Sequence, residues 1–181
     1  MTTIVLVGGN GYIGREVTRQ WLKRDPEAQI YVISRSDRQA IKDERIHHIQ
    51  VDVNDATAFD IALPEKIDYI VNLTYGSMDA IKSIRDFAEN HGAQAIGNIG
   101  VCDMKAPEFA DFVNMKRNEL NNLQAGTVRV ENVDITVAYG VDRDDDIAKM
   151  IQAGHFDSAS PIRVEIVACQ LIDQLTKSWL A

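Results

Sequence analysis

Glycines near the N-terminus have the spacing of a phosphate-binding loop. Gly9, Gly11 and Gly14 form the pattern G-x-G-x-x-G, and Gly8 with Gly11 and Gly14 forms G-x-x-G-x-x-G. Because glycine lacks a Cβ atom, such a loop can turn sharply and approach a pyrophosphate closely. The N–H groups and positive dipole end of a following helix then face the phosphates. The residues expected to bind the pyrophosphate of a dinucleotide are Gly8, Gly11, Tyr12, Ile13 and Gly14.

The sequence on either side of the loop supports this interpretation. An apolar run, Thr3–Val7, precedes the glycines and predicts a buried strand. After the loop, Ile13, Val17 and Trp21 recur at helical spacing until Asp25–Pro26 ends the pattern. Dinucleotide binding requires a strand, a glycine turn and a helix in this order. The alternative is a glycine-rich turn that binds no ligand.

An arginine follows the second predicted strand, where the nicotinamide cofactor is selected. In a dinucleotide fold, an acid at the end of this strand binds the ribose 2′-hydroxyl of NAD(H), whereas an arginine accommodates the 2′-phosphate of NADP(H). Here Arg35 directly follows the predicted strand Gln29–Ser34, and Asp37 lies beyond it. A guanidinium offers paired donors to a phosphate, so the sequence favours NADP over NAD. Alternatively, Arg35 is an ordinary surface arginine.

Acidic residues follow the third predicted strand. Asp52 and Val53 come at the end of this strand, where an adenine would lie, and Asp52 is a candidate partner for the adenine amine. A helix-capping aspartate is the alternative. Asp55 fits that role better, because Ala56–Ala62 has a helical pattern.

One lysine shares the apolar face of a predicted helix. Lys116 lies on the same side as Phe109, Phe112, Val113, Leu120 and Leu123. Burying an ammonium group costs free energy unless it is paired or reaches a polar ligand, and a cofactor ribose is a suitable ligand. The alternative is a lysine whose stem passes along the core edge to water.

These residues require an ordered set of strands and helices. The predicted strands are Thr3–Val7, Gln29–Ser34, Ile46–Val51, Tyr69–Thr74, Gln94–Ile99 and Asp134–Ala138. Because helical patterns separate the strands, the expected fold class is α/β, a doubly wound parallel sheet. Ser77–His91 reads as a crossover helix that ends at Gly92. For Ala125–Val133, strand and helix remain alternatives.

The last predicted helix should pack on the body of the protein. Its apolar stripe consists of Val164, Val167, Ala168, Leu171, Ile172, Leu175 and Trp179. Before it, at about 140–162, there is room for a small substrate-side cap. Within that stretch, Asp142, Asp144 and Asp146 resemble a calcium loop in spacing, but Ile147 stands where glycine is required, so no metal site is expected.

Composition narrows the function. The 181 residues, 45% of them hydrophobic, fit a single domain over 1–181. The net charge of −8 argues against nucleic acid or an anionic membrane as a partner and favours a small-molecule substrate. Cys102 and Cys169 provide no disulfide framework, and no signal peptide or membrane span is evident, so we expect a cytoplasmic protein.

Together these features resemble the extended and atypical short-chain dehydrogenase/reductases, which include NAD-dependent epimerase/dehydratase-like and NmrA-like proteins. The resemblance rests on the glycine loop, Ser34–Arg35, Asp52–Val53, Ile70–Thr74 and Ile135–Gly140, and further on Pro161–Ala168. It implies an NAD(P)-binding Rossmann fold over nearly the whole chain, with a minimal C-terminal cap.

The chain departs from this family at the catalytic signature, Tyr-x-x-x-Lys. The matching segment begins with Phe112 and ends with Lys116, so the lysine is present and the tyrosine is not. In the family the tyrosine is the general acid and base, and the lysine binds the nicotinamide ribose. The family serine or threonine is also missing at Asn98–Val101. Tyr75, after the fourth strand, is a candidate replacement donor, as are Tyr139 and Cys102.

The resemblance therefore implies an NADP(H)-binding reductase that passes hydride to a small acceptor such as a flavin, quinone or carbonyl, with Lys116 and Tyr75 as candidate catalytic residues. One alternative is an NmrA-like sensor without catalysis, whose protein partner responds to the redox state of the cofactor. Another is a nucleotide-sugar epimerase or dehydratase. The sequence does not define the oligomeric state.

Overall fold

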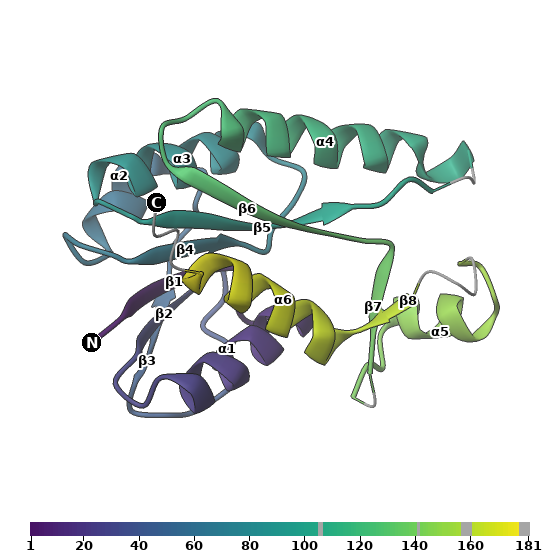
Figure 1. Cartoon of the computed structure of the whole chain (residues 1–181), viewed down its shortest axis with the longest axis horizontal. Helices are drawn as coiled ribbons and strands as arrows, with labels where there is room; N and C mark the ends of the chain where they lie inside the picture. The colour runs from purple at the N-terminus through teal and green to yellow at the C-terminus, as the bar shows by residue number, and fades with distance from the viewer. Residues whose placement is uncertain (105–106, 141, 157–160, 178–181) are drawn as a thin grey trace.

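A six-stranded parallel sheet forms the centre of the computed structural model, which describes residues 1–104, 107–140, 142–156 and 161–177 (Figure 1). The strands lie in the order β3-β2-β1-β4-β5-β6. Their bounds are β1 (Thr3–Val7), β2 (Gln29–Ser34), β3 (Ile46–Gln50), β4 (Tyr69–Asn72), β5 (Ala95–Val101) and β6 (Arg129–Ile135). This order is that of the Rossmann fold, so the predicted fold class is confirmed.

The sheet is covered by helices on both faces (Figure 1). On one face lie α1 (Tyr12–Arg24) and α6 (Val164–Thr176), and on the other lie α2 (Ala56–Ile61), α3 (Met78–Asn90) and α4 (Ala110–Gln124). The strands read as continuous apolar runs because both of their faces are buried. In β1, for example, successive side chains alternate between the two cores.

Local signals set the ends of two helices as predicted. The Ser77 hydroxyl accepts a hydrogen bond from the backbone N–H of Ala80 and caps α3, and Gly92 follows the helix with a φ of +71°. The Asp55 carboxylate accepts a hydrogen bond from the N–H of Ala58 and caps α2. The choice of Asp55 over Asp52 as the capping residue is confirmed.

The predicted sixth strand, Asp134–Ala138, is wrong in its bounds. The chain forms β6 from Arg129, bends at Thr136, and then forms β7 (Val137–Tyr139) in a second sheet with β8 (Pro161–Arg163). β6 is an edge strand whose first four residues are only half-buried and largely polar. Its sequence therefore lacks the apolar run of the inner strands, and the ambiguity over Ala125–Val133 resolves to a turn and then a strand.

The second sheet and α5 (Asp146–Gln152) extend from one end of the main sheet (Figure 1). α5 and the first residues of β8 fall within about 140–162, the stretch for which a small cap is predicted, and residues 141 and 157–160 of that stretch lie outside the described residues. α6 follows β8 directly and buries the predicted stripe from Val164 to Leu175. Trp179 also lies outside the described residues. No helix within the described ranges is long and apolar enough to cross a membrane.

Candidate cofactor-binding site

A cavity of about 670 Å³ lies where β1 and β4 end. The connections from these two neighbouring strands leave toward opposite faces of the sheet, which is where open parallel sheets bind their ligands. Of the predicted site residues, the cavity brings together Gly8, Gly11, Tyr12, Ile13, Gly14, Tyr75 and Lys116. Segments far apart in the sequence therefore meet at one place.

The glycine loop is too tightly packed for side chains at Gly8, Gly9 and Gly14. Gly8 has a φ of +85°, and a Cβ atom there would lie 3.1 Å from the backbone oxygen of Leu73. A Cβ atom on Gly14 would lie 2.6 Å from the Cα atom of Gly9. The loop thus brings the start of α1 close to the ends of β1 and β4.

The N-terminus of α1 is open to a ligand. Gly11 is its N-cap residue and supplies no side-chain hydrogen bond, and the first turn contains no acidic residue. The first N–H groups of a helix have no partner within the helix and favour an anion. A Cβ atom on Gly11 would meet only one neighbouring atom within 4 Å, the Gly8 oxygen at 3.2 Å. This backbone cradle fits the pyrophosphate of a nicotinamide dinucleotide.

Tyr12 lies between the glycine loop and the segment that follows β7. Its hydroxyl is buried without a hydrogen-bond partner, and a Cβ atom on Gly140 would lie 2.4 Å from it. Burial raises the pKa of this phenol, and the charge of Asp142 adds to the effect. The guanidinium carbon of Arg143 lies 4.8 Å from the ring centroid. The Tyr12 side chain therefore packs the two segments together.

Lys116 is buried in an ion pair. The side chain is 7% exposed, and its Nζ lies 2.8 Å from Oε2 of Glu119, which is fully buried. The other carboxylate oxygen of Glu119 accepts a hydrogen bond of 2.6 Å from the backbone N–H of Gly76, in the loop that carries Tyr75. Lys116 thus does not extend to water. Its charge is balanced, and it still lines the cavity.

A second ion pair at the cavity joins Arg143 to Asp145. The Arg143 Nε donates to one carboxylate oxygen of Asp145 at 2.9 Å, and a terminal nitrogen donates to the other at 3.2 Å. Arg143 also donates to the backbone oxygen of Ala138 in β7. The arginine lowers the pKa of Asp145, which in turn caps α5 by accepting from the N–H of Ala148 at 3.1 Å.

Sequence reasoning missed Glu119, Arg143 and Asp145. Glu119 had a detectable signal, because it lies three residues after Lys116 on the same helix. The Arg143–Asp145 pair had no comparable signal. Its place at the cavity depends on the bend after β6 and on contacts with β7, and the neighbouring aspartates made the segment read as a solvated acidic cluster.

Aromatic side chains surround the outer part of the cavity. Phe109 and Phe156 are stacked with ring centroids 5.7 Å apart, and Tyr75 meets Phe112 edge-on at 5.9 Å. Tyr75 is 70% exposed and Phe112 36% exposed, so both lie at the rim. Phe112 thus occupies the tyrosine position of the family signature, four residues before Lys116, without a hydroxyl group.

The fifth strand provides no hydroxyl group at the cavity. Gly100 and Val101 line it, whereas Asn98 is fully buried and does not. The Asn98 amide instead joins a row across the sheet: it accepts from Asn72 at 2.9 Å and donates to Asn132 at 2.8 Å.

Three predicted cofactor residues lie outside this cavity. Arg35 and Asp52 follow the neighbouring strands β2 and β3, and the charge of Arg35 contributes to lowering the pKa of Asp52. Hydrogen bonds from the backbone and side chain of Asn54 contribute most to that shift. The Val53 side chain packs in the core, so only its backbone is available to a ligand.

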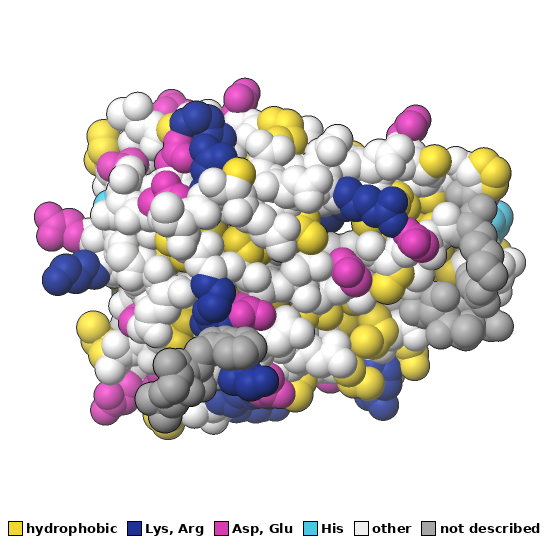
Figure 2. All heavy atoms as spheres, turned by 45° about the horizontal axis from the view of Figure 1, so that its top comes forward, with side chains coloured by type: hydrophobic (Ala, Val, Ile, Leu, Met, Phe, Trp, Pro, Cys, Tyr) yellow, Lys and Arg dark blue, Asp and Glu magenta, His cyan; other side chains and the backbone are white. Residues whose placement is uncertain are grey.

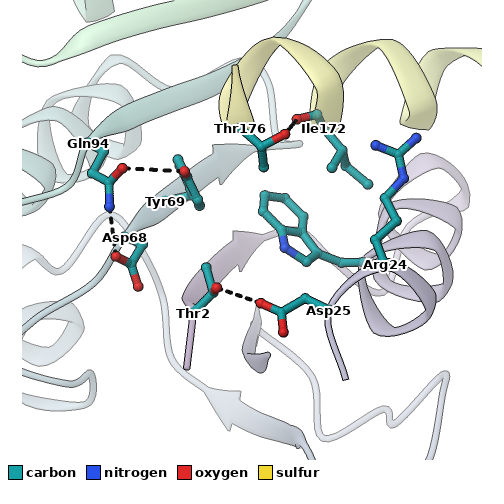
Figure 3. Close-up of a pocket in the computed structure, with 9 residues that line it drawn as sticks. Thr2, Arg24, Asp25, Asp68, Tyr69, Gln94, Ile172 and Thr176 are labelled. Atoms are coloured by element: carbon teal, nitrogen blue, oxygen red, sulfur yellow. Dashed lines mark hydrogen bonds between the residues drawn. The ribbon is translucent and has the colours of Figure 1, made fainter. Parts of the chain in front are cut away.

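A second hollow of about 390 Å³ lies at the opposite edge of the sheet (Figure 3). Trp21 and Tyr69 form its apolar part. Four of its polar side chains bond in pairs: Thr2 donates to Asp25 at 2.5 Å, and Gln94 donates to Asp68 at 2.9 Å. No glycine loop lies there, so the cavity at the ends of β1 and β4 is the candidate site.

Comparison with known proteins identifies the family. A sequence model of the NAD-dependent epimerase/dehydratase family matches residues 4–108, more than half of the 181-residue chain. The enzyme WbmH of Bordetella bronchiseptica, solved with NAD+, superposes with a TM-score of 0.75 at 10% identity, over 97% of this chain and 72% of that one. No curated protein matches in sequence.

Two further solved structures share the fold. A short-chain dehydrogenase/reductase of Veillonella parvula, in complex with NADP, gives a TM-score of 0.74 at 14% identity, over 98% of this chain and 88% of that one. WbmG of Bordetella bronchiseptica, in complex with NAD and UDP, gives 0.63 at 18% identity over 83% of this chain. The present chain spans only 60% of the length of WbmG. It belongs to the NAD-dependent epimerase/dehydratase family.

Proposed function

We propose that this member of the NAD-dependent epimerase/dehydratase family is an NADP(H)-binding reductase of the cytoplasm that passes hydride to a small acceptor. The observation that carries the proposal is the single cavity shared by the glycine loop, Lys116 and a group of aromatic side chains. The loop would hold the pyrophosphate, and the aromatic end leaves room for an acceptor beside the nicotinamide. Cys102 and Cys169 are both free thiols, consistent with a reducing compartment.

The chain's own residues would mainly bind and orient. Gly8, Gly11, Ile13 and Gly14 contribute backbone to the pyrophosphate site, and the Tyr12 side chain packs behind them. Lys116, held by Glu119, would donate to the ribose hydroxyls. A bound nicotinamide supplies the hydride chemistry. Protonation of the acceptor would come from water or from the exposed Tyr75.

The preference for NADP(H) rests on Arg35. It follows β2, where a 2′-phosphate would lie, and Asp52 follows the adjacent β3. Solved structures of this fold hold either cofactor, since WbmH is in complex with NAD+ and the Veillonella protein with NADP. The fold alone therefore leaves the choice to side chains such as Arg35.

Turnover and binding should be measured side by side. The affinities for NADP+ and NADPH are measured by titration, and NADPH oxidation is followed with flavins, quinones and aldehydes. We expect binding of NADPH together with oxidation by at least one acceptor class. Tight binding without oxidation by any acceptor would contradict the reductase and favour the sensor described next.

A redox sensor without catalysis is the second candidate. Phe112 stands where the family has its proton-donating tyrosine, and Gly100 and Val101 provide no hydroxyl group. An NmrA-like role, in which a protein partner responds to the bound cofactor, needs only binding. Its signature would be different affinities for NADP+ and NADPH with no turnover.

A nucleotide-sugar epimerase or dehydratase is the third candidate. The matched family includes such enzymes by name, and the structural neighbour WbmG binds UDP as well as NAD. Titration with a nucleotide sugar in the presence of cofactor tests this candidate directly, because saturable binding would favour it over the reductase.

A further inference from the structure

We propose that the aromatic end of this cavity, the acceptor end, binds an uncharged, flat carbonyl compound of the quinone type. It would exclude anionic substrates such as nucleoside diphosphate sugars. The inference rests on the proposed reductase function and names its substrate class. It comes from two features of the described cavity: compensated charges and aromatic walls.

Each cation at the cavity already has its own carboxylate. Among the described residues that line it, the cationic side chains are Lys116 and Arg143. Lys116 pairs with Glu119 at 2.8 Å, and Arg143 makes a two-pronged contact with Asp145. Because each pair is locally neutral, little positive potential remains for a diphosphate beyond the cofactor's own.

The face of the molecule drawn in Figure 2 has a mixed distribution of charges. On the face seen in Figure 2, basic side chains lie next to acidic ones and do not gather into one positive patch. The chain as a whole carries a net charge of −8. The net negative charge therefore gives an anionic substrate no long-range attraction to the molecule as a whole.

The walls of the acceptor end are aromatic and apolar. Phe109 directly precedes α4, and Phe156 follows α5. Their rings stack with an angle of 19° between the ring planes. Phe112 meets Tyr75 edge-on, and the apolar side chains of Val101, Met104, Ile147 and Met150 line the same cavity, together with the hydroxyl side chains of Thr74 and Thr136. A flat ring system gains dispersion and stacking energy on such walls, whereas a sugar diphosphate would lose hydration without replacing its hydrogen bonds.

The corresponding reaction is balanced with the cofactor as the reductant. A bound NADPH would supply one hydride to the quinone, and solvent water would supply one proton and release hydroxide to the buffer, so that the products would be the hydroquinone and NADP⁺. No general acid is required on the protein, because a hydroquinone oxyanion is a weaker base than an alkoxide. A cavity without the family tyrosine remains adequate for this acceptor.

A matched pair of ligands tests whether the acceptor end prefers an uncharged compound to an anion. Naphthoquinone and naphthoquinone sulfonate share one ring system and differ by a negative charge. Binding of each to the protein in the presence of NADP⁺, which cannot reduce them, is measured by calorimetry, with UDP-glucose as a third ligand. We expect the neutral quinone to bind at least about tenfold more tightly than the sulfonate and UDP-glucose not to bind saturably. Equal or tighter binding of the sulfonate, or saturable UDP-glucose binding, would overturn the proposal.

Two variants connect the result to the named residues. Phe156→Ala should weaken naphthoquinone binding about tenfold while the affinity for NADPH is kept. The control Ile61→Ala changes a residue on α2 that is 78% exposed and does not line the cavity, and it should change neither the naphthoquinone affinity nor the NADPH affinity.

Asp145→Asn keeps a good helix cap but frees the charge of Arg143, so sulfonate binding should rise about tenfold. Unchanged sulfonate affinity in Asp145→Asn would contradict charge compensation.

A failure of the reductase function gives other results than a failure of the acceptor class. Suppose that naphthoquinone binds, but NADPH either does not bind or reduces no acceptor. The reductase function is then wrong, and the preference of the acceptor end for an uncharged quinone holds. If NADPH binds and some charged acceptor turns over while naphthoquinone neither binds nor reacts, the inference about the acceptor is wrong and the reductase function holds.

Discussion

The two ends of the cavity are built in different ways. The glycine-loop end is made mainly of backbone from one continuous stretch, Gly8 to Gly14, and a Cβ atom on Gly14 would make a contact of 2.6 Å. The acceptor end is made of side chains from β5, α4, β7 and α5 and from the segments next to them that carry Tyr75, Phe109 and Phe156, and two ion pairs lie at the same cavity. A backbone site depends on local geometry, whereas a side-chain site depends on how distant segments meet. The first end should therefore be sensitive to added atoms and the second to lost partners.

The largest effect is expected at Gly14. In Gly14→Ala the new Cβ collides with backbone of Gly9, and we expect a loss of about 3 kcal/mol in the free energy of unfolding together with at least a hundredfold weaker NADPH binding. Gly11→Ala is the matched control, because its Cβ meets one atom at 3.2 Å. It should keep stability within about 1 kcal/mol and still weaken NADPH binding about tenfold, since the methyl group occupies cofactor space. Equal free energies of unfolding for the two variants would contradict the tighter packing inferred at Gly14.

At the side-chain end, Lys116→Met should be destabilising on its own. It leaves the fully buried Glu119 carboxylate without its partner, so we expect a loss of about 3 kcal/mol in chemical denaturation. The double variant Lys116→Met/Glu119→Gln removes both charges while its amide oxygen can still accept from Gly76. It should recover most of that stability and bind NADPH about tenfold more weakly than the natural chain. If the double variant bound NADPH as tightly as the natural chain does, Lys116 would be a structural residue only.

A hydroxyl group added at the acceptor end should allow the protein to donate a proton to a carbonyl substrate. Phe112→Tyr recreates the family spacing of tyrosine and lysine, and we expect turnover with an aldehyde to rise about thirtyfold. Quinone reduction should change little, because it needs no general acid from the protein. Phe112→Leu provides the control for a simple change of shape. Should aldehyde turnover rise equally in both variants, proton donation would not be the cause.

The smallest effect is expected outside the cavity. Arg35→Ala should weaken NADPH binding about tenfold and leave NADH binding unchanged, because only NADPH carries the 2′-phosphate. Fluorescence titration with both cofactors measures the difference. Equal losses for the two cofactors would refute the role of Arg35 in selecting NADP(H).

The contrast between the two ends also explains what the sequence could predict. β1 and β2 begin and end at the predicted residues, because an inner parallel strand is a continuous apolar run bounded by turn residues. The glycine loop was equally evident, since its geometry is local. β6 was misplaced because an edge strand needs fewer apolar residues, and its true start, Arg129, is charged.

Side-chain pairing across distant segments was much harder to predict. That Lys116 would be buried followed from its helix face, but the role of Glu119 depends on the loop at Gly76, which lies 43 residues earlier. Arg143 could not be assigned to the cavity without knowing that the chain bends at Thr136 and brings β7 beside the glycine loop. Helical periodicity and turn signals carry no information about such encounters.

The small sheet of β7 and β8 limits how this protein could change in evolution. One residue separates β6 from β7, and none separates β8 from α6. An insertion at either junction would pull on the main sheet or on the helix packed against α1. The connection between β7 and β8 joins two strands that are already paired with each other, so it could lengthen without moving either junction. New acceptor specificities could therefore arise there by insertion while the cofactor half of the molecule is inherited unchanged.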